Sequence, residues 1–198
     1  MATFNQKNIT DFRSRMTGGG ARSNLFEVEI TFPGGLGISE STVSDKVPFL
    51  VKAAEIPSSN LGNIPVPYRG RVLPIAGDRT FDPWTVTVIN DTDFELRDAF
   101  EKLSNFINDV QTAQGTVNPE TYQTEARVFQ KGRQGSGPGD TEKTLRQYDF
   151  VGIYPNVVSS IPLDFGATDQ IEEFQVTFNY LFYEVLGGGS TPILTEKT

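Results

Sequence analysis

Apolar and polar residues alternate with a period of two in several runs of the chain, and this alternation predicts half-buried β-strands. The first run begins at Asn24 and sets apolar side chains against polar ones: Phe26, Val28, Ile30 and Phe32 against Glu27, Glu29 and Thr31. A second clear run sets Trp84, Val86 and Val88 against Thr85 and Thr87. The apolar set of each run is expected to face the core.

Weaker patterns predict more strands around these two. Residues 47–55 fit a strand, and residues 63–75 fit one that is interrupted by Pro65, Pro67 and Pro74. Proline cannot donate a ladder hydrogen bond, so that strand is expected at an edge or with a bulge. Residues 125–131 and 143–154 fit a long hairpin, and residues 171–185 fit a last strand. One face of this last strand carries Phe174, Val176, Phe178, Tyr180 and Phe182.

A helical period appears at residues 93–112, where the apolar residues form one stripe. Its members are Leu96, Ala99, Phe100, Leu103, Phe106, Ile107 and Val110. Thr92 lies three residues before Glu95, a spacing typical of a capping box, and Gly115 is expected to stop the helix. Phe100 and Leu103 are predicted to pack on the sheet.

Together these patterns predict a mainly β protein, a single-domain antiparallel β-sandwich or barrel of about seven strands with one flanking α-helix. The domain is expected over residues 24–186. An irregular basic arm, residues 1–23, precedes it, and a loose tail, residues 187–198, follows it. The glycine- and serine-rich residues 33–41 are expected to form a loop.

Composition narrows the chemistry that this domain could perform. The 198 residues include no cysteine and no histidine, which excludes disulfides, thiolate or imidazole metal sites, and histidine-based triads. The first residues hold no apolar run typical of a signal peptide, and no stretch approaches the length of a membrane span. The sequence therefore predicts an aqueous setting, with no cofactor and no metal.

Charge is divided unevenly along the chain. The formal net charge is −8, which argues against a protein that grips the phosphate backbone of nucleic acid. Residues 1–23 hold four cations, Lys7, Arg13, Arg15 and Arg22, against Asp11, so the arm carries 4 − 1 = +3 and the rest −8 − 3 = −11. An arm of this kind is either simply solvated or bound to nucleic acid or to an acidic protein surface. Among specific partners, the acidic body of a neighbouring copy is favoured, through Arg13, Arg15 and Arg22.

Three segments resemble catalytic or ligand-binding motifs without completing them. The glycine-rich residues 132–140 lack the lysine and the following helix of a phosphate-binding loop, so a hairpin tip is expected. Residues 90–95 place oxygen ligands at alternate positions but lack the central glycine of a calcium loop, so a helix cap is expected. Glu172 and Glu173 are expected to be solvated strand residues rather than a hydrolytic pair. No catalytic residue is predicted.

One segment resembles a known family. Residues 76–91, AGDRTFDPWTVTVIND, are similar to a signature stretch of tail tube proteins from contractile-tailed bacteriophages. Residues 22–30 resemble the opening strand of that family, and residues 152–178 resemble its closing region. The positions that carry the likeness in the signature segment are Gly77, Asp78, Arg79, Thr80, Phe81, Trp84, Asn90 and Asp91. The segments 34–46 and 132–140 are longer than in the shortest members.

The resemblance implies a structural virion protein of the tail, assembled in the host cytoplasm. It implies six-subunit rings that stack head to tail, a contractile sheath outside, baseplate and tail-terminator proteins at the ends, and a lumen through which genomic DNA passes. Type VI secretion tubes are similar in fold. In a monomer several strands would have open edges, and a barrel shared around a ring removes them.

Other functions remain open from the sequence. One is a related tube component, either a baseplate protein that initiates the tube or a tube subunit of a secretion or injection machine. Another is a carbohydrate-binding module or hydrolase of the virion. Within the signature segment, Asp78 and Arg79 are predicted to hold a turn between the third and fourth strands through a local ion pair, and Gly77 to supply an unusual backbone angle. A contact between subunits is the alternative role for the pair.

Overall fold

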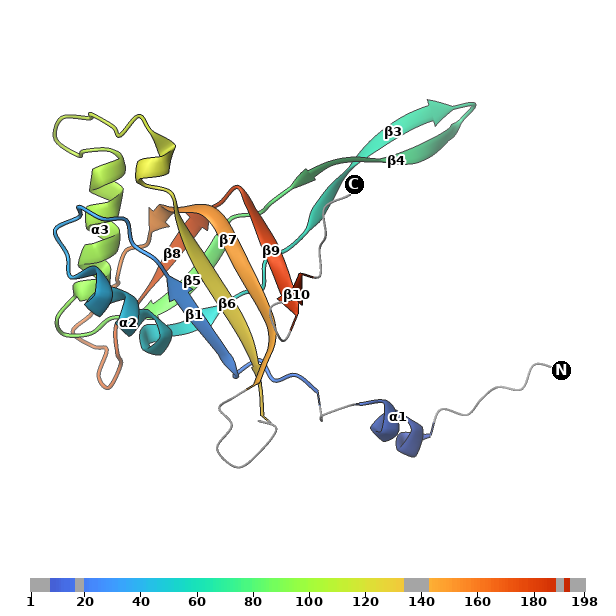
Figure 1. Cartoon of the computed structure of the whole chain (residues 1–198), viewed down its shortest axis with the longest axis horizontal. Helices are drawn as coiled ribbons and strands as arrows, with labels where there is room; N and C mark the ends of the chain where they lie inside the picture. Colours follow the sequence, from blue (N-terminus) through green and yellow to red (C-terminus); the bar gives the residue numbers. More distant parts are fainter. Residues whose placement is uncertain (1–7, 17–19, 134–142, 188–190, 193–198) are drawn as a thin grey trace.

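A computed structural model describes residues 8–16, 20–133, 143–187 and 191–192 of the chain. Figure 1 shows a β-sheet body with two helices at one end and a two-stranded hairpin that projects far from it at the other. A short helix near the N-terminus lies apart from the sheet. The described residues thus form three parts, namely the body, the projecting hairpin and the detached helix.

The body is one antiparallel sheet of eight strands in the order β1-β6-β7-β8-β5-β2, with β9 beside β7 and β10 beside β9. The strands are β1 Phe26–Ile30, β2 Val51–Ala54, β5 Trp84–Ile89, β6 Thr124–Gly132, β7 Lys143–Val158, β8 Glu173–Asn179, β9 Phe182–Gly187 and β10 Thr191–Pro192. The sheet curls until its end strands β1 and β2 contact each other. The predicted mainly β, barrel-like fold is therefore confirmed, as are the strands at 26–30 and 84–89 and the long hairpin β6–β7.

Strand β7 belongs to both halves of the curled sheet. Its first part pairs with β9 through Arg146–Val151, and its last part pairs with β8 from Tyr154 onward. Between them Gly152 has φ +65°, and a Cβ there would approach Leu181 Cδ1 to 2.7 Å. A side chain at this position would meet both backbone strain and a close contact. The single last strand expected at 171–185 is therefore wrong, because the chain breaks at Tyr180 and Leu181 and crosses from β8 to β9.

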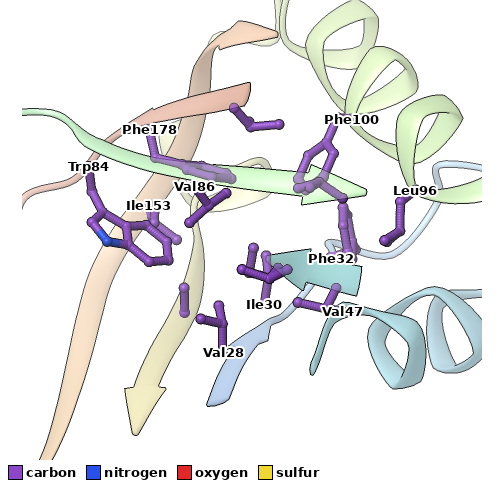
Figure 2. Packing of buried hydrophobic residues seen from close by; sticks show 14 of the residues in the cluster. Val28, Ile30, Phe32, Val47, Trp84, Val86, Leu96, Phe100, Ile153 and Phe178 are labelled. Atoms are coloured by element: carbon purple, nitrogen blue, oxygen red, sulfur yellow. The ribbon is translucent and has the colours of Figure 1, made fainter. Parts of the chain in front are cut away.

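The core lies inside the curl and is closed by the two helices. Figure 2 shows Trp84, Val86 and Phe178 with side chains of β1 that point into the same space. Val28, Val86 and Val176 are 0% exposed, which agrees with the period-two pattern of their strands. Phe100 of the larger helix meets Phe32, Phe174 and Phe178 with ring centroids 5.3–6.4 Å apart. The predicted packing of that helix on the sheet is confirmed.

Helix α3, Glu95–Ile107, carries the predicted apolar stripe but is shorter than expected. Leu96, Ala99, Phe100 and Leu103 are buried, whereas Val110 lies beyond the helix and is exposed. The capping-box prediction is wrong, since the residue before the helix is Phe94 in the left-handed region and no side chain caps it. The helix ends at an extended Asn108, and in the turn that follows the Asp109 carboxylate accepts N–H groups from Gln111 and Thr112.

Helix α2, Glu40–Leu50, was not predicted, and it replaces the first half of the strand expected at 47–55. Its buried residues, Val43 and Val47, lie four residues apart on one face and pack against the core. The arm expected to be irregular also contains a helix, α1, Ile9–Arg15, which the Asn8 side chain caps by accepting the Thr10 N–H. A 3₁₀ turn, Pro119–Thr121, precedes β6.

The projecting hairpin consists of β3, Asn60–Tyr68, and β4, Arg71–Thr80. The sequence predicts one proline-broken strand here, which is wrong, because Arg69 and Gly70 form a two-residue turn with φ +46° and +79°. The expectation of an edge or bulge is confirmed, since β3 and β4 form a separate two-stranded sheet with a register shift between Leu61 and Asn63.

Two predicted segments lie mostly outside the described residues, namely the loop 132–140 beyond Arg133 and the tail from 187 onward apart from β10. In the part of the chain that the structure describes, no helix has both the length and the apolar content that a membrane crossing requires.

Candidate assembly interface

Four residues of the signature segment, Gly77 to Thr80, lie in β4 at the base of the hairpin and not in a turn. Gly77 has no positive φ, so the predicted backbone angle is wrong. Its role is close packing, because a Cβ at Gly77 would lie 3.2 Å from the Gly62 carbonyl carbon. Gly62 and Gly77 thus let the two strands approach each other where the hairpin leaves the body.

Asp78 and Arg79 are adjacent in a strand, so their side chains point to opposite faces. Within the described residues they form no ion pair with each other, and the predicted local pair is wrong. The Arg79 guanidinium instead donates to the Ser59 hydroxyl at 3.1 Å. Both residues are exposed on the side of the molecule from which the hairpin projects.

Asp82 joins the two chain segments that enter and leave the hairpin, a role that the sequence did not indicate. Its Oδ2 atom accepts hydrogen bonds from the Ser58 hydroxyl at 2.8 Å and from the Asn60 amide at 2.5 Å. The Ser58 and then the Asn60 hydrogen bond hold the pKa of Asp82 below its ordinary value. We call these three side chains the Asp82 clasp, and they fix the direction in which the hairpin leaves the body.

Phe81 and Trp84 attach the signature segment to the core. Phe81 packs against Tyr180 and Tyr183 with ring centroids 5.7 Å away. Trp84 stacks on Phe150 at 4.5 Å, and its indole N–H donates to the Glu55 carbonyl at 2.8 Å. The buried polar atom of the tryptophan is thereby satisfied.

Asn90 and Asp91 end the segment beside α3 and serve structural contacts. Asn90 is buried, and its side-chain amide donates to Glu172 at 2.9 Å while its backbone N–H bonds the Glu172 carbonyl. Asp91 lies 2.8 Å from the Lys46 ammonium. Glu173 pairs with Lys52, so both carboxylates of the Glu172–Glu173 pair are engaged in holding the fold.

The calcium-like run at 90–95 binds a lysine of the same chain. The Lys46 ammonium lies 2.8 Å from Asp91, 3.7 Å from Asp93 and 2.6 Å from Glu95. The hydrogen bonds to Asp91 and then Glu95 raise the pKa of Lys46 above its ordinary value. No group of three or more aspartates or glutamates within the described ranges is arranged to hold a metal ion.

The hairpin exposes a large apolar surface that its own chain leaves uncovered. The exposed residues of β3 and β4 include Leu61, Ile64, Val66, Tyr68, Val72, Leu73 and Ile75. Two cations, Arg69 and Arg71, flank its tip, and Arg69 lies 5.4 Å from the Tyr68 ring centroid. A single hairpin of two strands is marginally stable in water, so this surface is suited to contact another molecule.

The three arginines predicted to dock the arm all precede β1 in the chain. Arg13 and Arg15 occupy the last turn of α1, and Arg22 lies on the link to β1, all exposed. None of them forms an ion pair within the described residues. The Gln130 amide donates to the carbonyls of Arg22 and Leu25 at 2.8 Å, which fixes the point where the arm leaves the body.

Comparison with known proteins identifies the family. A sequence model of the phage tail tube protein family matches residues 21–186. The tail tube protein gp19 of Enterobacteria phage T4 is 32% identical over 176 residues, covering 87% of this chain and 96% of that protein. The tail tube protein of Serratia phage KSP90 is 26% identical over 174 residues, covering 87% and 93% of the two chains.

Solved structures share the fold at low sequence identity. A chain of the anti-feeding prophage baseplate aligns with a TM-score of 0.57 and 13% identity, over 85% of this chain and 96% of that one. A chain of the sheath–tube complex of an extracellular contractile injection system aligns with a TM-score of 0.51 and 12% identity, over 88% and 97%. These structures show the fold, while the family match over residues 21–186 and the 32% identity to gp19 show the family: the chain belongs to the phage tail tube protein family.

Proposed function

We propose that this protein forms rings of six copies that stack head to tail into the tube of a contractile phage tail. Membership of the family makes it a structural protein rather than an enzyme. The observation that carries the proposal is the hairpin β3–β4, whose apolar side chains project from the body without a cover from their own chain. In a stack, the next copy covers these side chains. A head-to-tail contact of this kind repeats along the stack without closing on itself, so every copy inside the stack is covered.

The proposed mechanism is passive. A sheath surrounds the tube, baseplate and tail-terminator proteins occupy its ends, and genomic DNA passes through the lumen without sequence-specific contacts. The net charge of −8 per chain supports this, since an acidic wall repels phosphate and lets a duplex slide. The anti-feeding prophage baseplate and the sheath–tube complex contain chains of the same fold, which supports contacts of this kind.

Inter-subunit roles are proposed for two sets of residues. Asp78 and Arg79 lie exposed at the base of the hairpin and are proposed to contact a neighbouring copy. The arginines at 13, 15 and 22 are proposed to dock the arm on the acidic body of the next copy. In both cases the support is exposure without an ion pair inside the described chain.

Electron microscopy of the purified, concentrated protein tests the proposal. We expect long tubes of uniform width with a central channel in negative stain, and a concentration threshold for their formation in sedimentation. Single rings that never elongate would indicate a tube-initiating protein instead. A protein that stays monomeric at high concentration would contradict the proposed function.

A further inference from the structure

The hairpin β3–β4 has two unlike faces, which its register defines. Residues paired across an antiparallel ladder share a face, and successive residues alternate. We call one side the broad face, formed by Ile64, Val66, Tyr68, Leu73 and Ile75 with the paired Arg71. We call the other side the proline face, formed by Asn63, Pro65, Pro67, Val72, Pro74 and Ala76. The broad face carries the larger and more flexible apolar side chains.

The prolines also determine what the edges of the hairpin can do. Pro65 lies directly opposite Pro74, and Pro67 follows two residues after Pro65, so all three occupy one phase of the ladder. Proline has no N–H, and in a paired strand it occupies positions whose nitrogen points away from the partner. The outer edge of β3 therefore lacks donors at residues 65 and 67, and the outer edge of β4 lacks one at residue 74. An added strand would miss two donors along β3 and one along β4, which weakens a ladder at either edge.

Charge indicates what covers the broad face. Residues 60–80 hold Arg69, Arg71 and Arg79 against Asp78, which gives 3 − 1 = +2, so the rest of the chain carries −8 − 2 = −10. A basic hairpin on an acidic body is complementary to another copy of the same chain. Such complementarity fixes register and orientation at an interface.

We propose that the hairpin docks on a second copy of this chain through the side chains of its broad face, without adding a strand to that copy at either proline-bearing edge. This inference rests on the proposed function, and it names the face and the kind of contact that the stacked copies use. The tip arginines, Arg69 and Arg71, then lie against acidic groups of the second copy. The proline face stays outside the contact.

Neighbouring residues on opposite faces supply a matched test. Leu73 on the broad face and Val72 on the proline face are 58% and 62% exposed. In the full-length protein, Leu73→Ser is expected to raise the threshold concentration for tube formation about tenfold or more, because it removes a buried leucine from every junction. Val72→Ser is expected to leave the threshold within about twofold of the parent. Thermal unfolding of both variants checks that the body, which lies apart from the hairpin, keeps its stability.

A third variant tests the edge. Val72→Pro removes the outward N–H from the free edge of β4, at the phase that Pro74 already occupies, and it is expected to form tubes as Val72→Ser does. Loss of tubes with Val72→Pro but not with Val72→Ser would show strand addition and overturn the inference. Equal loss with Val72→Ser and Leu73→Ser would also overturn it, since the proline face would then dock. A parent protein without tubes refutes the proposed function itself, whereas these comparisons presuppose that the parent forms them.

Discussion

At the scale of single residues, charged side chains hold the elements of the body together. Lys46 from α2 lies between three carboxylates at the start of α3, and each of these would repel the others without it. Asp82 also joins two segments, at the base of the hairpin, where its carboxylate accepts hydrogen bonds from Ser58 and Asn60. Both residues join segments that lie far apart in the sequence or on opposite sides of a turn.

Replacing Lys46 with methionine is expected to lower the melting temperature most at neutral pH. The pKa of Lys46 is raised in the folded state, so its stabilisation is complete below its ordinary pKa and is lost as the pH rises through the folded value. In the variant, the carboxylates of Asp91, Asp93 and Glu95 lose their shared cation, so the deficit is full at neutral pH. It shrinks at alkaline pH, where the parent protein also loses the charge of Lys46. Circular dichroism melting curves measure this, with Lys52→Met at the more exposed ion pair as the control. A deficit that does not vary with pH would contradict the role of the cluster.

Ser58→Ala is expected to raise the pKa of Asp82 toward its ordinary value, because the hydrogen bond that lowers it most is removed. A lowered pKa means that the clasp stabilises the fold above the ordinary pKa of aspartate and loses this effect as the pH falls through the folded value. Carboxyl chemical shifts in an NMR titration report the change directly. Ser59→Ala is the control, since Ser59 contacts Arg79 and not Asp82. If the pKa of Asp82 were the same in Ser58→Ala as in the parent, the clasp would not form in solution.

At the scale of elements, α3 is the part of the fold that covers one end of the core. Leu103→Asp would bury an unpaired charge at a site that is 3% exposed, at a cost of about 3–5 kcal/mol, which is enough to unfold a marginal domain. Lys102→Asp, one residue earlier on the exposed side, is the control and should melt close to the parent. Chemical denaturation gives the difference in unfolding free energy. A folded Leu103→Asp protein with an unchanged melting temperature would contradict the packing of Leu103 in the core.

Elements with a strong period were predictable, and those whose shape depends on distant partners were not. The strands at 26–30 and 84–89 and the stripe of α3 follow from local spacing alone. Helix α2 shows just two buried valines at helical spacing, and Pro48 in its last turn points toward a break. In the hairpin, both faces carry apolar side chains, so the sequence lacks a clear alternation that would have marked the turn at Arg69 and Gly70.

The sequence predicted which segment forms the candidate site, but not which residues from other elements contact that segment. The likeness of residues 76–91 singled out Asn90 and Asp91, and both make specific contacts. Their partners Glu172 and Lys46 come from other elements, and sequence spacing does not show which residues the fold brings together. The same holds for Asp82, which follows the hairpin, because its donors Ser58 and Asn60 lie just before and at the start of β3.

At the scale of the whole molecule, stacking has to overcome charge. Six copies in a ring carry 6 × −8 = −48, if the ring is sixfold as proposed. At physiological ionic strength the Debye length is about 8 Å, so close contacts dominate, and each exposed ion pair contributes about 0–1 kcal/mol. The contribution of the arm is small for one copy and recurs for every copy in the ring. Salt therefore has opposing effects, since it relieves repulsion between rings and weakens the arm.

Removal of residues 1–22 is expected to leave a folded domain that polymerises poorly. The triple change of Arg13, Arg15 and Arg22 to Glu tests the charge by itself, and it is expected to raise the threshold concentration for tubes. Light scattering and microscopy measure both, and melting curves confirm that the domain stays folded. If the triple variant forms tubes as readily as the parent, the arm acts instead as a spacer or through exposed apolar residues such as Ile9 and Phe12.

The register of the sheet has a consequence for the order in which the chain can fold. Strand β1 pairs with β6, where Phe26 meets Gln130, so the first strand of the body waits for a partner about a hundred residues later. The strands of the hairpin β3–β4 pair across their own two-residue turn, and local hairpins form in about 1–10 μs. During synthesis the hairpin is therefore available, with its apolar side chains, well before the sheet that anchors it. The prolines at 65, 67 and 74 remove three outward N–H donors from its edges, which disfavours strand pairing between unfinished chains on neighbouring ribosomes.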